Sequence, residues 1–184
     1  ALSGPLTLAS VTSAGVKGSS SNFSPSMSSS GTIVAFESLS PNLSPDDTDF
    51  NGDIFLRDLT TSLITLASTS SAGVKGNDDS VAPSMNGDGS MVAFNSTATN
   101  LDPGDTDTIN DVYIKDLSSG ELVLASTSDG GTKGNGSSGG PSLSRDGTRV
   151  AFQSLATNLD PGDTDVTQDI YVKDTATGDL TLAS

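Results

Sequence analysis

Three short loops of this chain carry aspartates at the same relative positions. They read DTDFNGD over Asp47–Asp53, DTDTIND over Asp105–Asp111 and DTDVTQD over Asp163–Asp169, with Asp at positions 1, 3 and 7 of each. Calcium takes six to eight oxygen ligands in a flexible geometry, and carboxylates that alternate along a short loop suit it. The candidate metal ligands are Asp47, Asp49, Asn51, Asp53, Asp105, Asp107, Asp111, Asp163, Asp165 and Asp169.

The first loop has the most complete ligand set. Asn51 adds an oxygen at position 5 and a glycine follows it, so the start of this loop resembles the calcium loops of EF-hands, dockerins and integrin propellers. In the second loop Ile109 replaces the ligand at position 5, and in the third Thr167 offers only a hydroxyl. Asp58 stands at position 12, but a strand that rises about 3.3 Å per residue would carry it far from Asp47.

The loops can also be interpreted without a metal. Aspartates in loops often accept hydrogen bonds from nearby backbone amides. Lysines also recur in the long connections, as GVKG around Lys17 and Lys75 and as GTKG around Lys133. They could hold an anionic ligand, but acids so outnumber bases that we expect the lysines to pair with neighbouring aspartates. Without any cation, the clustered carboxylates would repel one another.

The loops recur because the whole chain repeats every 58 residues. Closely similar segments, LTLAS, ITLAS, LVLAS and LTLAS, start at residues 6, 64, 122 and 180 without any insertion or deletion. A fixed period of this kind indicates an array of one supersecondary unit whose copies stack on one another. We divide the chain into a linker stub at 1–5, repeats at 6–63, 64–121 and 122–179, and a terminal strand at 180–184.

Each repeat predicts four short strands. In the third repeat these are Pro141–Ser144, Thr148–Ser154, Asp169–Lys173 and Leu180–Ser184, and a Ser-x-Asp-Gly turn joins the first two. Gly, Pro and Asp interrupt every apolar run, and no run has a helical period. Four antiparallel strands stacked radially describe a propeller blade. A β-solenoid is the alternative, although its coils usually repeat at a shorter period.

Several separated pieces recur in order in every repeat. In the third they are PSLSRDGTRVAFQS, ATNLDPGDTD, DIYVKD and a TG turn. This series resembles the TolB-like, WD-related β-propeller repeat, and the resemblance covers Leu6–Ser184. It implies an all-β propeller built from 58-residue, four-stranded blades, three in this chain. Propellers of this kind commonly serve as binding platforms, and some are attached to a separate hydrolase domain.

Ring closure needs more blades than this chain supplies. Propellers usually have four to eight blades, so we expect two copies to associate head to tail into a six-bladed homodimer. The alternative is that the chain is a fragment of a longer array. The segments Leu6–Ser10 and Leu180–Ser184 would compete for one edge position in a closed ring, and we expect one of them to be displaced.

The surplus length of the repeat lies in its loops. Tight turns join the first strand to the second and the third to the fourth, whereas long connections join the second to the third and the fourth to the next blade. In an up-and-down blade both long connections emerge on one face, which is therefore the expected working face. We expect Val34, Val92, Val150, Phe36, Phe94 and Phe152 to form blade cores, and Asp58, Asp116 and Asp174 to begin turns.

Composition narrows the function. The chain has 23 acids against 8 Lys and Arg and a formal charge of −15, which disfavours nucleic acid and anionic membranes as partners. It contains no His and no Cys, so Ser-His-Asp and Cys-His catalysis are excluded within it. We therefore expect a non-catalytic, secreted or surface-exposed module that binds a protein or a glycan. We expect calcium as the ion that its aspartate loops would hold. The alternatives are a structural spacer, the propeller portion of a larger hydrolytic protein, or a carboxylate-based glycosidase.

Overall fold

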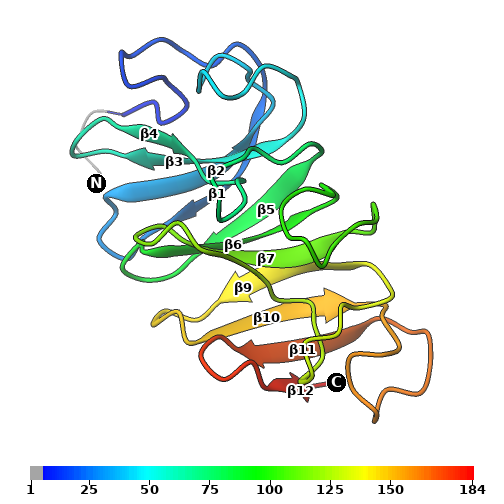
Figure 1. The fold of residues 1–184 in the computed structure, drawn as a ribbon. Coiled ribbons are helices and arrows are strands. Elements are labelled where there is room, and N and C mark those ends of the chain that lie inside the picture. The colour runs from blue at the N-terminus through cyan, green and yellow to red at the C-terminus, as the bar shows by residue number, and fades with distance from the viewer. Residues whose placement is uncertain (1–5) are drawn as a thin grey trace.

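A computed structural model describes residues 6–184, and the predicted linker stub at 1–5 lies outside the described residues. The described chain contains twelve β-strands and no helix (Figure 1). The strands are β1 (Asn22–Met27), β2 (Ile33–Ser38), β3 (Asp53–Asp58), β4 (Ile64–Leu66), β5 (Ser80–Met85), β6 (Met91–Ser96), β7 (Asp111–Asp116), β8 (Leu122–Leu124), β9 (Ser138–Leu143), β10 (Arg149–Ser154), β11 (Asp169–Asp174) and β12 (Leu180–Leu182).

These strands form three antiparallel sheets, which we call the first, second and third blades. Their strand orders are β1-β2-β3-β4, β5-β6-β7-β8 and β9-β10-β11-β12, so every blade is built from four consecutive strands. The prediction of four antiparallel strands per repeat is confirmed. The first strand of the third blade begins earlier than predicted, at Ser138, because Ser138 still pairs with Ser154 across the sheet. The fourth strands have only three residues each.

Only one of the two terminal copies of the LTLAS segment belongs to a sheet. Residues 180–182 pair with β11 in the third blade, whereas residues 6–10 belong to no strand. The N-terminal copy thus lies outside the sheets of the described chain, and the competition expected in a closed ring stays a prediction. The three described sheets do not close into a ring.

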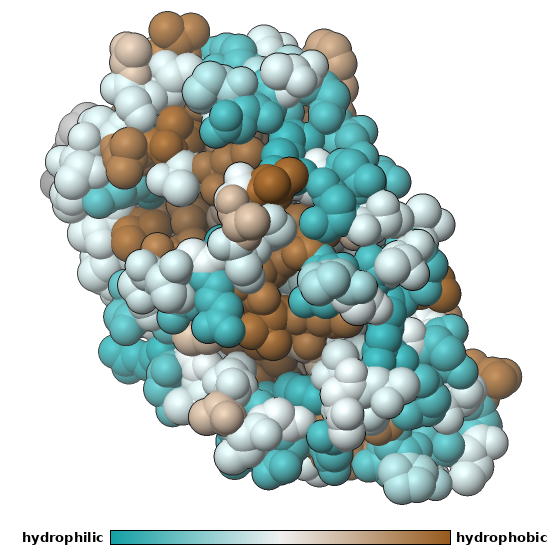
Figure 2. Space-filling view, viewed as in Figure 1, coloured by the Kyte–Doolittle hydropathy of each residue, from teal (hydrophilic) through white to brown (hydrophobic). Residues whose placement is uncertain are grey.

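The core lies between neighbouring blades. Side chains alternate along each strand, so each blade has an N-side face towards the preceding repeat and a C-side face towards the following one. Ile54 on the C-side face of the first blade packs with Phe94 on the N-side face of the second, and Val112 packs with Phe152 in the same way. The predicted core positions are all buried. Figure 2 shows hydrophobic side chains in the hollows between the blades.

The connections separate onto two rims, as the sequence predicts. In Figure 1 the tight turns lie on the left, the long loop after β2 lies at the top, and the long loops after β6 and β10 lie on the right. On the tight-turn rim the backbone nitrogen of Ser29 donates to the Gly87 carbonyl at 2.7 Å, and the Gly87 nitrogen donates to the Arg145 carbonyl at 2.7 Å. A Cβ at residue 87 would lie 2.7 Å from that Arg145 oxygen, so this close approach requires glycine.

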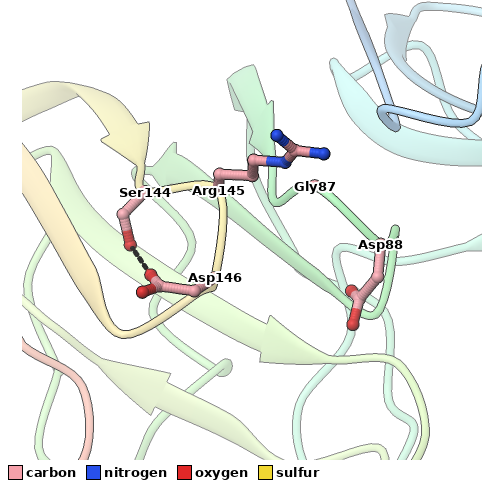
Figure 3. Close-up of a pocket in the computed structure, with 5 residues that line it drawn as sticks. All are labelled: Gly87, Asp88, Ser144, Arg145 and Asp146. Carbon is pink, nitrogen blue, oxygen red and sulfur yellow. Dashed lines mark hydrogen bonds between the residues drawn. The ribbon is translucent and has the colours of Figure 1, made fainter.

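A cleft of about 520 Å³ opens on the tight-turn rim, between the second and third blades. Gly87, Asp88, Ser144, Arg145 and Asp146 line it (Figure 3). The Ser144 hydroxyl donates to Asp146 Oδ1 at 2.7 Å, and hydrogen bonds from Ser144 and Thr148 lower the pKa of Asp146 to about 2. This carboxylate therefore stabilises the Ser-x-Asp-Gly hairpin turn that the sequence predicts.

No helix with the length and apolarity needed to cross a bilayer occurs within residues 6–184.

Candidate cation-binding site

The fold brings the three aspartates of each loop together. In every cluster one carboxylate oxygen from each residue lies within 4.8 Å of the others. The last aspartate of each trio begins the third strand of its blade, and the first two lie in the long loop before it. Local hydrogen bonds shape the loop, because Asp47 Oδ1 accepts from the Asp49 nitrogen at 3.4 Å and Asp49 Oδ1 accepts from the Asn51 nitrogen at 2.9 Å.

In the first cluster, Asp47, Asp49 and Asp53, the cation is a lysine. The Lys75 ammonium lies 2.9 Å from Asp53 Oδ2, 3.0 Å from Asp49 Oδ2 and 3.7 Å from Asp47 Oδ1. Lys75 lies in the connection between β4 and β5, which leads into the second blade. The cluster therefore joins one blade to the connection that starts the next.

The second cluster, Asp105, Asp107 and Asp111, repeats this geometry. The Lys133 ammonium lies 2.8 Å from Asp111 Oδ2, 3.0 Å from Asp107 Oδ2 and 3.5 Å from Asp105 Oδ1. The expectation that the lysines pair with neighbouring aspartates is confirmed for Lys75 and Lys133. Because an ammonium ion lies among these carboxylates, a divalent ion would have to displace it from either cluster.

The third cluster, Asp163, Asp165 and Asp169, differs from the first two. Within residues 6–184 no lysine or arginine lies at ion-pair distance from it. Its first aspartate accepts a hydrogen bond from Tyr171 at 2.7 Å, and its last accepts one from Ser184 at 2.6 Å. Calcium binding at this loop stays a prediction. At Asn51 the side-chain amide donates to the Asn77 carbonyl at 3.4 Å in the neighbouring connection.

Burial and the lysine act in opposite directions on the first cluster. Burial raises the pKa of Asp53 to about 6, while hydrogen bonds from Ser68 and Lys75 oppose that rise. Burial lowers the pKa of Lys75, but its hydrogen bonds to Asp53 and Asp49 outweigh this and leave the pKa raised. The ammonium is thus held in its charged form, and its positive charge offsets the cost of burying the negative carboxylates.

A carboxyl titration by NMR should separate buried from turn-forming aspartates. Hydrogen bonds from Ser119 and Ser118 lower the pKa of Asp116 to about 2, whereas that of Asp53 is about 6. We expect Asp116 to stabilise the fold above its unfolded pKa, which is about 3.9, and this contribution to fall as the pH drops towards 2. Asp53 should act in the opposite sense, because the folded chain binds its proton more tightly, so its contribution falls as the pH rises from about 4 to 6. Equal titration midpoints for the two carboxyls would contradict this assignment.

One blade lacks a hydrogen bond that the second and third blades have. The hydroxyl of Tyr113 donates to Asp105 Oδ2, and that of Tyr171 donates to Asp163 Oδ2. The equivalent residue of the first blade is Phe55, and Asp47 Oδ2 there is buried without a partner. The first cluster is therefore less well satisfied than the second, although its lysine is in place.

Sequence reasoning missed a second set of buried cations, one at the end of the third strand of each blade: Arg57, Lys115 and Lys173. The Lys115 ammonium donates to the carbonyls of Thr69, Ser70 and Gly120 at 2.7–2.9 Å, so it anchors the start of the connection between blades. The sequence does contain a signal for this set. Each basic residue follows a buried aromatic by two positions, so the two side chains share one face of the strand, and a charged side chain is rarely buried unless it is paired.

Two equivalent grooves lie on the long-loop rim. One of about 770 Å³ is lined by Thr12, Ser13, Asn42 and Thr48 among others, and one of about 400 Å³ by the matching residues of the next repeat. Their walls combine hydroxyl, amide and carboxylate groups with apolar side chains, and alanine, leucine and proline line both grooves. A surface of this composition can offer hydrogen bonds to a polar ligand along a repeated track.

Solved structures with similar folds are known. The chain resembles TolB from Acinetobacter baumannii at a TM-score of 0.55 and 21% identity, over 89% of this chain and 32% of that one. It resembles a putative TolB from Agrobacterium tumefaciens at a TM-score of 0.57 and 15% identity, over 88% of this chain and 48% of that one. It resembles the β-propeller domain of the Trilobed protease from Pyrococcus furiosus at a TM-score of 0.54 and 10% identity, over 89% of this chain and 43% of that one. The fold is thus a TolB-like β-propeller.

The chain spans less than half the length of each of these structures. No protein-family model and no curated protein matches the sequence. The likenesses therefore establish the fold and leave the activity to be argued from the site.

Proposed function

We propose that this chain is a non-catalytic β-propeller module that binds a protein or glycan partner through its long-loop rim. The observation that supports this most directly is the pair of equivalent grooves on that rim. A repeated groove suits a partner that makes several similar contacts, and loops on a rigid scaffold are where binding residues concentrate.

The acidic character of this rim favours some partners over others. The three aspartate clusters all lie there, on a chain of formal charge −15. A partner with a basic surface, or a glycan that offers hydroxyl groups, suits it, while nucleic acid would be repelled. We also propose a secreted or surface-exposed location for this module.

We further propose that a second copy completes a six-bladed ring. Support comes from the three unclosed blades and from the edges and apolar faces that an open array exposes. In this arrangement the long-loop rims of both copies form one continuous face.

The partner-binding proposal is tested with a glycan array and with crosslinking to candidate proteins. The probes are the wild-type chain and a variant that fills one groove, Thr48→Trp, with Thr61→Trp on the opposite rim as the control. We expect binding that the first substitution weakens at least tenfold and the control leaves unchanged. Binding that responds equally to both, or not at all, would refute the proposed face.

A further inference from the structure

We propose that Lys17 of a second copy inserts between Asp163, Asp165 and Asp169, and so forms the contact that closes the ring. This inference rests on the proposed association of two copies and names the residues that mediate it. It follows from comparing each position with its equivalents in the other two repeats.

The receiving cluster has the same donors as two lysine sites in the same chain. The clusters at Asp47–Asp53 and Asp105–Asp111 each hold one ammonium, 2.8–3.0 Å from their last two aspartates. The cluster at Asp163–Asp169 has three aspartates at the same spacing, and one carboxylate oxygen of each also lies within 4.8 Å of the others. In both occupied clusters the lysine comes from the connection that leads into the next blade.

Lys17 is presented in the same way as the bound lysines. Asn42 donates to the Lys17 carbonyl at 3.0 Å, just as Asn100 donates to the Lys75 carbonyl at 2.8 Å. A backbone bridge also joins Val11 to Lys17 and has a counterpart in each later repeat. Yet Lys17 is exposed and, among residues 6–184, has no carboxylate at ion-pair distance. The loop is therefore preorganised for an ion pair that residues 6–184 do not complete.

Apolar surface is uncovered at both ends of the array. On the C-side faces, Ile54 and Val112 are 0% exposed, but the equivalent Ile170 is 44% exposed. On the N-side faces, Met85 is 7% exposed, whereas the equivalent Met27 is 56% exposed. The difference arises because no following blade covers Ile170 and no preceding blade covers Met27 within residues 6–184. A head-to-tail contact would cover both.

A backbone hydrogen bond supports the same register. Ser26 Oγ accepts from the Met85 nitrogen at 3.0 Å, and Ser84 Oγ accepts from the Leu143 nitrogen at 3.0 Å. The next pair in this series is Ser142 Oγ with the Met27 nitrogen of the second copy. The ion pair, the apolar contact and this hydrogen bond share one docking geometry, the one that already joins the blades within the chain. In that geometry residues 6–10 of the second copy reach the edge position that residues 180–184 hold beside β11, so one of these two segments has to leave it.

The test is a charge exchange followed by sedimentation equilibrium at physiological salt. Lys17→Glu and Asp165→Lys each place like charges at both interfaces of a two-copy ring, so we expect each variant alone to raise the dimer Kd about 100-fold or more. A mixture of the two has one native pair and one reversed pair, and we expect it to restore the dimer. Glu121→Lys, an exposed charge on the opposite rim, should leave the Kd unchanged, and thermal unfolding checks that each variant folds.

The outcomes separate this inference from the proposal on which it rests. A dimer that ignores both substitutions, or a mixture that fails to associate, would overturn the lysine contact and leave the six-bladed ring standing. Larger oligomers that respond to both variants would support the contact and overturn closure by two copies. A monomer at every concentration would overturn both, without touching the proposed partner-binding rim. If Lys17→Glu fails to fold, Lys17→Met replaces it, with a smaller expected loss of association because it removes the ammonium without adding a like charge.

Discussion

Replacing Lys75 with methionine is expected to lower the free energy of unfolding by about 3–5 kcal/mol, the usual cost of removing one partner of a buried ion pair. The Lys75 side chain is 11% exposed and that of Asp53 0%, so water cannot take over the role of the ammonium. Urea unfolding at pH 7 measures the change. The loss should shrink at lower pH, because the uncompensated Asp53 can then bind a proton.

The chain contains its own control for this substitution. Lys17 occupies the same repeat position but is exposed, so Lys17→Met should change the stability of the monomer by less than about 0.5 kcal/mol. Lys133→Met should behave as Lys75→Met does, because its ion pairs have the same lengths to within 0.2 Å. Equal small effects at all three positions would show that the clusters do not depend on lysine. Recovery of the Lys75→Met variant in millimolar calcium would show that the loop accepts a metal once the lysine is gone.

Substitutions at Tyr113 and Phe55 should change stability in opposite directions. Tyr113→Phe removes a hydrogen bond to the buried Asp105 carboxylate and should cost about 1.5–3 kcal/mol, since the acceptor is charged. Phe55→Tyr should stabilise the chain, because it offers a donor to the unpartnered Asp47 Oδ2. Thermal or urea unfolding of the two variants provides the measurement.

Geometry supports the exchange at position 55. The ring of Phe55 stacks on Phe36 at a centroid distance of 6.1 Å and an interplanar angle of 25°, and Tyr113 stacks on Phe94 at 5.9 Å and 25°. A tyrosine in the first blade can therefore adopt the position that Tyr113 has in the second. If Phe55→Tyr destabilised the chain, the first blade would have to differ from the second around Asp47 in a way that the stacking does not reveal.

Much of the fold could be predicted from local pattern. The 58-residue period predicts one unit in three copies, and alternation in segments such as TRVAFQS predicts which side chains face a neighbouring sheet. Turn residues predict the hairpins, because Asp and Gly at fixed positions favour few backbone conformations. The recurrence of DTD also predicts that the aspartates of each loop lie close together, and the structure places one carboxylate oxygen of each within 4.8 Å of the others.

Some features depend on contacts between segments distant in sequence. The cation among Asp47, Asp49 and Asp53 comes from Lys75, more than twenty residues later, and only the stacking of two blades brings them together. Sequence reasoning proposed calcium for these loops and expected the lysines to pair with neighbouring aspartates, but it could not assign a particular lysine to a particular cluster. The partnerless Asp47 Oδ2 could not be predicted either, because the loss of one hydroxyl at Phe55 matters only when the strand and the loop are packed.

By itself, the sequence determined a repeated all-β unit, its alternating buried positions and its acidic loops, because these follow from residue type and local spacing. The tertiary structure alone decided which copy of the LTLAS segment joins a sheet and which lysine lies in which cluster. It also decided that one cluster and one lysine are left without partners among residues 6–184. Those outcomes depend on distances between blades, which local propensity does not encode.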